Sequence, residues 1–167
     1  MLIRQLTSSD AEGYRQLRLR GLREAPAAFA ESYDEFAAQS AAEIAATLED
    51  PAGLCHVFGA FDDDDLIGIV GVTRDRLEKM RHKGYIWGMY VAPEHHGRGV
   101  GRGLLEAAIA HSRQIVGLEQ LRLIVGEANA GARKLYEAVG FTAFGREPRE
   151  LKTDGKYYDS LHMWLAL

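Results

Sequence analysis

The stretch "EHHGRGVGRGLLEAAIAHSRQ", residues 94–114, decides the fold. Glycines at positions 97, 99, 101 and 103 alternate with larger residues, and Leu104–Ala110 then reads as a strong helix. A glycine at a helix start is less favourable than alanine by roughly 0.5–1 kcal/mol, so four of them need a reason. The strand-like run "GYIWGMYV" (84–91) directly precedes them. The pattern predicts a tight turn without side chains between a strand and a helix.

This turn fits neither of two well-known phosphate loops. No Lys-Ser or Lys-Thr follows the glycines, as a P-loop requires, and Arg102 or Leu104 occupies the last position of a Gly-x-Gly-x-x-Gly fingerprint. Arg-Gly segments that bind RNA are repeated and disordered, whereas this one leads into an amphipathic helix. Backbone N–H groups from about His96 to Gly101 can instead point into one concavity at the positive end of a helix dipole. Together with the charges of Arg98 and Arg102, they predict a pyrophosphate site.

The rest of the chain alternates between strands and helices. Periodicity predicts strands at 1–7, 54–61, 66–75, 84–91, 121–126, 141–151 and 156–166, and helices at 9–24, 40–49, after the glycines, and at 130–139. Ser8, Ser9 and Asp10 are candidate caps of the first helix. The order β-α-α-β-β-β-α-β-α-β-β predicts an α/β or α+β architecture, a mixed sheet with helices packed on its faces.

Composition limits the class of protein. The chain has 167 residues, 47% of them hydrophobic and 26% charged, which predicts one globular domain over 1–167. The net charge of −4 argues against a nucleic-acid partner, and no apolar run approaches the ~20 residues that span a bilayer. The polar start is unlike a signal peptide. Cys55 is the single cysteine, which excludes an internal disulfide and favours a cytoplasmic location.

Two segments carry a resemblance to a known family. "VAPEHHGRGVGRGLL" (91–105) resembles the acyl-CoA-binding motif of the GNAT superfamily of N-acetyltransferases, Gln/Arg-x-x-Gly-x-Gly/Ala, at positions 96–101. "NAGARKLYEAVGF" (129–141) is similar to the second cofactor segment of that family, and the matching residues are Asn129, Ala132, Leu135, Tyr136, Gly140 and Phe141. The resemblance implies a twisted, mixed but mostly antiparallel sheet of about seven strands with helices on both faces. It also implies transfer of an acetyl group from acetyl-CoA to a primary amine of a small molecule or peptide.

The resemblance assigns cofactor contacts to individual positions. Main-chain groups of Met89, Tyr90 and Val91 would pair with the pantetheine arm and polarise the thioester oxygen. The diphosphate would lie on His96, Gly97, Arg98, Gly99, Val100 and Gly101. Asn129 would be either a helix N-cap or a hydrogen-bond partner of the cofactor. His96 stands where the family has Gln or Arg. If this position binds the cofactor through its backbone N–H, the change is tolerable; if a side chain is needed there, the change weakens cofactor binding.

Tyr136 is the predicted general acid. Ala132, Leu135, Tyr136 and Val139 share one helix face, so a plain core tyrosine is the alternative. With a pKa near ~10, tyrosine keeps its proton at pH 7 and can give it to the departing CoA sulfur. The strand 84–91 lacks the carboxylate that many family members use as a base. Water is one substitute, and the candidate residues elsewhere are Glu31, Glu35, Asp159 and His162.

The acceptor site and the partners are less defined. Tyr33, Phe36, Trp87, Tyr157, Tyr158 and Asp159 either line the acceptor cleft or only pack, and the aromatic C-terminal strands allow a homodimer. No metal site is predicted: the run Asp62–Asp65 is typical of a solvated hairpin tip, and His82, His95 and His111 lack a shared ligand spacing. Cys55 reads as a core residue. Two other classes stay open, an acyl-CoA-binding sensor without catalysis and an enzyme acting on nucleotide phosphates.

Overall fold

The computed structural model describes residues 1–167, and its seven strands form one sheet in the order β1-β2-β3-β4-β5-β7-β6. The strands are β1 Leu2–Gln5, β2 Cys55–Asp62, β3 Asp65–Arg74, β4 Lys83–Val91, β5 Gln120–Gly126, β6 Thr142–Thr153 and β7 Lys156–Ala166. The helices are α1 Ala11–Glu24, α2 Tyr33–Ala37, α3 Ala41–Glu49, α4 Val100–Ser112 and α5 Ala130–Ala138, with 3₁₀ turns η1 Ser8–Asp10, η2 Pro26–Ala28, η3 Glu78–Met80 and η4 Pro93–His95. Only β4 and β5 are parallel, so the predicted mixed, mostly antiparallel sheet is confirmed.

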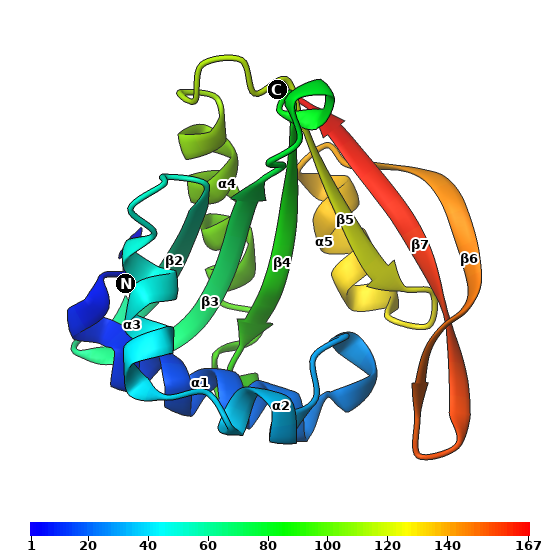
Figure 1. Cartoon of the computed structure of the whole chain (residues 1–167). Helices are drawn as coiled ribbons and strands as arrows, with labels where there is room; N and C mark the ends of the chain where they lie inside the picture. Colours follow the sequence, from blue (N-terminus) through cyan, green and yellow to red (C-terminus); the bar gives the residue numbers. More distant parts are fainter.

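Helices cover both faces of the sheet (Figure 1). On one face α1, α2 and α3 enclose a core that includes Leu17, Phe36 and Ile44. On the other face α4 buries Leu104, Leu105 and Ala108 against the sheet, and α5 adds Tyr136. The i, i+1, i+4 spacing of the buried α4 residues is the apolar stripe expected of a helix packed on a sheet. The sheet therefore lies between two cores, and α4 is anchored firmly behind the glycine turn.

The sheet splits in the middle, where β4 and β5 diverge (Figure 1). The two strands pair only between 83–85 and 120–122, although β4 continues to Val91. A bulge in the β3–β4 pairing, with Gly88 at φ 64°, accompanies the divergence. Ala92 N donates to Ile67 O at 2.9 Å, and alternation in an antiparallel pair then turns the N–H and C=O of Val91 away from β3. Free main-chain groups of β4 thus face the gap.

The first half of the chain differs from the prediction in two places. The short helix α2 was not predicted, although Ser32 and Glu35 form a reciprocal capping box that marks its start. Of the possible caps Ser8, Ser9 and Asp10, Asp10 is the N-cap residue of α1, but its side chain makes no capping hydrogen bond. The three residues form η1, and the Asp10 carboxylate accepts from Thr7 N and from Arg4. Short, locally capped turns leave too little periodicity to be read from sequence.

The two predicted hairpins are confirmed. Asp62 and Asp65 pair at the tip between β2 and β3. Asp154 and Gly155 turn the chain between β6 and β7 with φ of 50° and 74°, as a two-residue turn with two left-handed residues requires. None of the helices combines the length and the apolar character needed to cross a bilayer.

Candidate active site

The glycine turn presents a row of free N–H groups. The amides of residues 97–102, six in succession, donate to no acceptor in the protein. Gly97 and Gly99 adopt left-handed φ values of 73° and 80°, and Gly99 is the N-cap of α4. The predicted row is corrected at its start, because His96 N donates to Pro93 O at 3.1 Å in η4. Free donors at a helix N-terminus form an anion site.

The other two glycines of the stretch have a packing reason. A Cβ at Gly101 would lie 3.1 Å from both Met89 Cε and Leu135 Cδ2, and a Cβ at Gly103 would lie 2.7 Å from Ile3 Cδ1. Real side-chain contacts of 2.7 Å do not occur, so Gly103 lets α4 approach β1 closely. Only part of the glycine pattern therefore serves the anion site, and the rest seats the helix.

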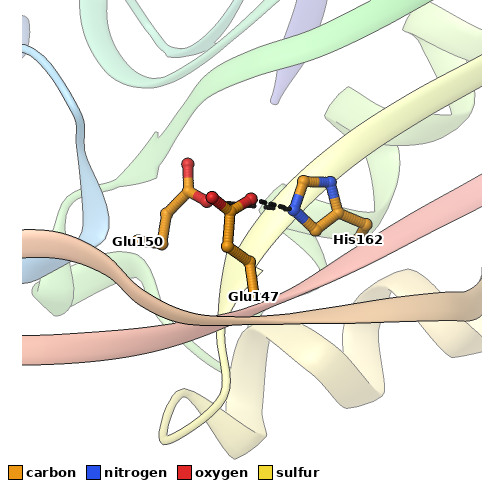
Figure 2. Close-up of side chains that lie close together, drawn as sticks. All are labelled: Glu147, Glu150 and His162. Atoms are coloured by element: carbon orange, nitrogen blue, oxygen red, sulfur yellow. Dashed lines mark hydrogen bonds and ion pairs between the residues drawn. The ribbon is translucent and has the colours of Figure 1, made fainter.

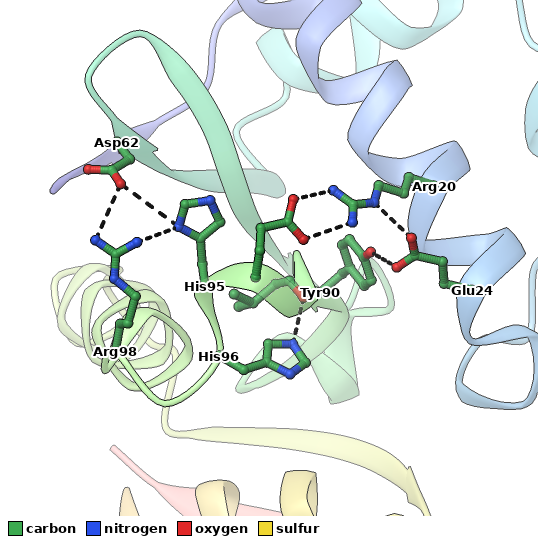
Figure 3. A network of polar contacts seen from close by, with 9 residues as sticks. Arg20, Glu24, Asp62, Tyr90, His95, His96 and Arg98 are labelled. Carbon is green, nitrogen blue, oxygen red and sulfur yellow. Dashed lines mark hydrogen bonds and ion pairs between the residues drawn. The ribbon is translucent and has the colours of Figure 1, made fainter.

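His96 acts through its side chain as well as its position. Its Nε2 lies 2.8 Å from the carbonyl oxygen of Val91, the group that faces the split between β4 and β5 (Figure 3). Because a carbonyl only accepts, Nε2 carries the hydrogen and donates it. The ring thus joins the turn to the end of β4. Arg98 turns away from the split, with Nη1 2.9 Å from His95 Nδ1 and Nη2 3.4 Å from Asp62.

Two adjoining cavities follow the split. The first, of about 750 Å³, is lined by Glu24, Ala25, Ala28, Phe29, Met89, Tyr90, Val91, Pro93, His95, His96, Gly97, Gly99, Val100, Gly101, Arg102, Asn129, Gly131, Ala132 and Leu135. The second, of about 780 Å³, is lined by residues 24–28, Met89, residues 124–129, Ala132, Leu135, Tyr136 and residues 157–159. Met89, Asn129 and Leu135 border both, so one continuous cleft runs from the free amides into the sheet.

The cleft suits a long ligand with an anionic head. One end carries the unpaired amides, and the middle is walled by apolar side chains such as Met89 and Leu135. The unpaired edge of β4 offers main-chain groups along its length, as an added strand would need. This combination fits the diphosphate and the pantetheine arm of coenzyme A. Of the predicted cofactor contacts, all except Arg98 lie on the cleft.

The two predicted residues of α5 also border the cleft. Asn129 Oδ1 accepts from Ala132 N at 3.0 Å, so it is the helix N-cap, and its amide nitrogen remains available. Tyr136 is buried, and its side chain lines the second cavity without a hydrogen bond to another residue. Burial raises the pKa of Tyr136 to about 12, so the hydroxyl keeps its proton.

Glu24 is a carboxylate at the cleft that sequence reasoning missed. It accepts from Tyr90 Oη at 2.5 Å and from Arg20 Nε at 2.8 Å, and Arg20 also holds Glu94 with two bonds of 2.7 and 2.8 Å (Figure 3). The hydrogen bond from Tyr90 and the contact with Arg20 lower the pKa of Glu24. These contacts tie the end of α1 to β4 and η4. No local pattern marks this carboxylate, because its partner lies 66 positions away.

The four candidate bases lie in different places. Asp159 borders the second cavity, where it pairs with Arg146 and accepts from Arg149 N at 2.7 Å. Glu35 caps α2, and Glu31 pairs with Arg18 at 3.2 Å; neither lines the cleft.

His162 lies outside the cleft lining as well. Its Nε2 is 2.9 Å from Glu147 and 3.8 Å from Glu150 (Figure 2). The hydrogen bond between the two carboxyl groups raises the pKa of Glu150. These three side chains come from β6 and β7, and they form a separate polar cluster rather than part of the cavity wall.

The aromatic candidates for the acceptor site divide into two groups. Tyr157 and Tyr158 line the second cavity next to Asp159. Phe36 is buried against Tyr14, Tyr33 contacts Arg23, and Trp87 donates from Nε1 to Thr73 at 2.8 Å. The last three belong to the packing of the α1 face and its border, outside the cleft lining.

Comparison with known proteins agrees with this geometry. Residues 18–141 match the sequence profile of the Acetyltransferase (GNAT) family. The spermidine N(1)-acetyltransferase of Vibrio cholerae is 33% identical over 84 residues, which are 50% of this chain and 49% of that protein. The mycothiol acetyltransferase of Thermobispora bispora is 48% identical over 59 residues, 35% of this chain and 20% of that protein. The chain thus spans about half, or less, of the length of these curated relatives.

Two solved structures share the whole fold. An acetyltransferase of the GNAT family from Streptococcus pneumoniae has a TM-score of 0.91 at 26% identity, and the match covers 99% of both chains. A GNAT superfamily phosphinothricin acetyltransferase from Sinorhizobium meliloti, in complex with AcCoA, has a TM-score of 0.84 at 21% identity, over 99% of this chain and 88% of that chain. With its split sheet, its glycine turn and the profile match over most of its length, this chain belongs to the GNAT acetyltransferase family.

Proposed function

We propose that this protein is an acetyl-CoA-dependent N-acetyltransferase that acts on a primary amine of a small molecule or peptide. The observation that carries the proposal is the row of six unpaired amides, residues 97–102, at the head of the split between β4 and β5. The curated relatives by name acetylate spermidine or take part in mycothiol chemistry, which supports an amine acceptor.

The chain binds and orients the cofactor with main-chain groups. The amides of residues 97–102 hold the diphosphate, and His96 fixes the turn against Val91. The free edge of β4 around Met89 pairs with the pantetheine arm, and the amide nitrogen of Asn129 reaches the same path. Because these donors are fixed before binding, little ordering is needed when the ligand arrives.

Bound acetyl-CoA supplies an activated thioester whose acetyl group passes to nitrogen as the carbon–sulfur bond breaks. The main chain at Met89 polarises the thioester oxygen. Tyr136 gives its hydroxyl proton to the departing sulfur and regains a proton from water, and its raised pKa keeps that proton in place until it is needed.

Loss of the amine proton falls to water in this proposal. Glu24 and Asp159 border the cleft, but each is held by an arginine. The hydrogen bond from Tyr90 and the contact with Arg20 also lower the pKa of Glu24, which makes it a weak base. A lysine-like amine of pKa ~10.4 is neutral at pH 7 only about once in 2,500 molecules. The rate should therefore rise about tenfold per pH unit until the pKa of the acceptor is reached.

The test is release of free thiol from acetyl-CoA with a panel of monoamines, polyamines, amino acids and peptides. Release above the hydrolysis background, with the acetylated amine found by mass spectrometry, supports the proposal. Tight binding of coenzyme A without release on any amine would instead indicate a sensor module. Stabilisation by ATP but not by coenzyme A would indicate an enzyme of nucleotide phosphates.

A further inference from the structure

Arg18 is a buried cation for which the reaction above has no use. It lies on α1 with its side chain only 6% exposed. Nη2 lies 3.2 Å from Glu31 Oε2, and Cζ lies 4.6 Å from the ring centroid of Phe29. Gln39 holds the other oxygen of Glu31 at 3.0 Å. This ion pair accounts for one of the three nitrogens.

The other two nitrogens have no partner. Nε and Nη1 of Arg18 are buried and make no hydrogen bond. They carry three of the five N–H donors of the side chain. A buried charge with unsatisfied donors is costly, and a methionine of similar length would pack in the same space. Retention of an arginine here therefore calls for a role beyond holding Glu31.

The free side of Arg18 faces the bulge in β4. Nη1 lies 3.4 Å from the position that a Cβ at Gly88 would take. Met89, which follows Gly88, borders both parts of the cleft, and so does Ala28, which precedes Phe29. The guanidinium thus lies against Gly88, the residue that precedes Met89, at the point where the sheet opens.

We propose that Arg18 is a positioning residue for acetyl transfer. Its charge acts through the peptide between Gly88 and Met89 and stabilises the negative charge that builds up on the thioester oxygen as the amine nitrogen bonds to the carbonyl carbon. The carbon–sulfur bond then breaks with its electron pair going to sulfur, which takes the proton of Tyr136, while water takes the proton of the amine. A fixed charge in a site that excludes water is effective because little solvent screens it. This inference rests on the proposed function.

The experiment compares Arg18→Met, Arg18→Lys and Arg15→Met with the parent protein. Arg15 is the matched control, because it lies on the same helix, is half-buried and donates only to Ala37 O at 3.2 Å. One readout is kcat and KM. The other is the infrared carbonyl stretch of ¹³C-labelled acetyl-CoA bound without an amine, which reports polarisation of the thioester and needs no turnover.

Arg18→Met is expected to lower kcat about 10- to 100-fold with KM for acetyl-CoA within about twofold, and to move the carbonyl stretch to higher wavenumber. Arg18→Lys is expected to keep most of the parent's kcat and to leave the carbonyl stretch near its parent position, and Arg15→Met is expected to change neither quantity. Glu31→Gln is a further variant, which keeps Arg18 but removes the opposing charge, so the stretch is expected at lower wavenumber.

Several results would overturn the inference. An unchanged stretch and kcat in Arg18→Met, or equal losses in the methionine and lysine variants, would leave Arg18 with a purely structural role. If Arg18→Met does not fold, an unchanged stretch in Glu31→Gln has the same meaning. Absence of acetyl transfer by the parent on any amine would instead contradict the proposed function, and the infrared result still decides the role of Arg18.

Discussion

Replacement of Gly99 by alanine tests the anion site without a steric clash. No atom lies within 4 Å of the position that a Cβ at Gly99 would take, so the whole effect comes from the backbone. The φ of 80° is in the left-handed region, where a residue with a Cβ is less favourable by about 1–2 kcal/mol. Alanine also lowers the conformational entropy of the unfolded chain, which raises the free energy of unfolding by about 0.4–1 kcal/mol. We expect Gly99→Ala to lower the free energy of unfolding by about 1 kcal/mol.

The same strain should weaken binding of coenzyme A. If the alanine turn relaxes to another conformation, binding must restore the left-handed one, at the full 1–2 kcal/mol. Since about 1.4 kcal/mol corresponds to a tenfold change, Kd for coenzyme A should rise roughly 5- to 30-fold. Isothermal titration calorimetry measures this directly, and it needs no acceptor.

Gly13→Ala is the matched control for this substitution. Gly13 lies within α1, no atom lies within 4 Å of its would-be Cβ, and it does not border the cleft. Alanine there should raise stability by about 0.5–1 kcal/mol and leave Kd unchanged. A folded Gly99→Ala protein with a Kd within twofold of the parent would refute the assignment of the diphosphate to this turn.

Three further predictions concern single side chains. Tyr136→Phe should lower kcat about 100-fold, with little change in stability or in Kd for coenzyme A, because the hydroxyl has no partner in the protein. The raised pKa of Tyr136 also predicts that the parent shows no alkaline loss of rate up to about pH 10. Full activity of the variant in steady-state assays would exclude the acid role. His96→Ala should raise Kd for coenzyme A about fivefold through loss of the hydrogen bond to Val91, whereas His96→Gln should keep Kd within twofold of the parent. Equal Kd values for the two variants by calorimetry would show that this hydrogen bond is unimportant. Burial and the neighbouring His56 lower the pKa of His111, so its contribution to stability is fully present above the unfolded pKa near ~6.5 and is lost as pH falls below that value toward the folded pKa. In urea titrations, His111→Leu should therefore reduce the loss of stability between pH 7 and 5. An unchanged loss would contradict this cause.

Local patterns accounted for most of the fold. All seven strands were predicted within two or three residues of their ends, because alternation and turn residues such as Asp154 and Gly155 act over a few positions. The helix α2 was missed because five residues give no period. The bulge at Gly88 could not be predicted, because a register shift depends on the partner strand as much as on β4 itself.

The candidate site was predicted where its motif is continuous in sequence. The turn at 97–101, apart from Arg98, borders the cleft together with Asn129 and Tyr136, as the two segments implied. Side chains that act through partners distant in sequence were not predicted. Glu24 depends on Tyr90, and Arg18 depends on Gly88, contacts that only the packing of α1 on β4 creates. The general base and the identity of the acceptor stay predictions for the same reason.

A crystal structure of the protein with coenzyme A tests the central claim most directly. Diphosphate oxygens are expected within about 2.7–3.2 Å of several amide nitrogens between Gly97 and Arg102, with the pantetheine chain in the gap beside Met89. A diphosphate held elsewhere by side chains, with those amides turned to solvent, would contradict it.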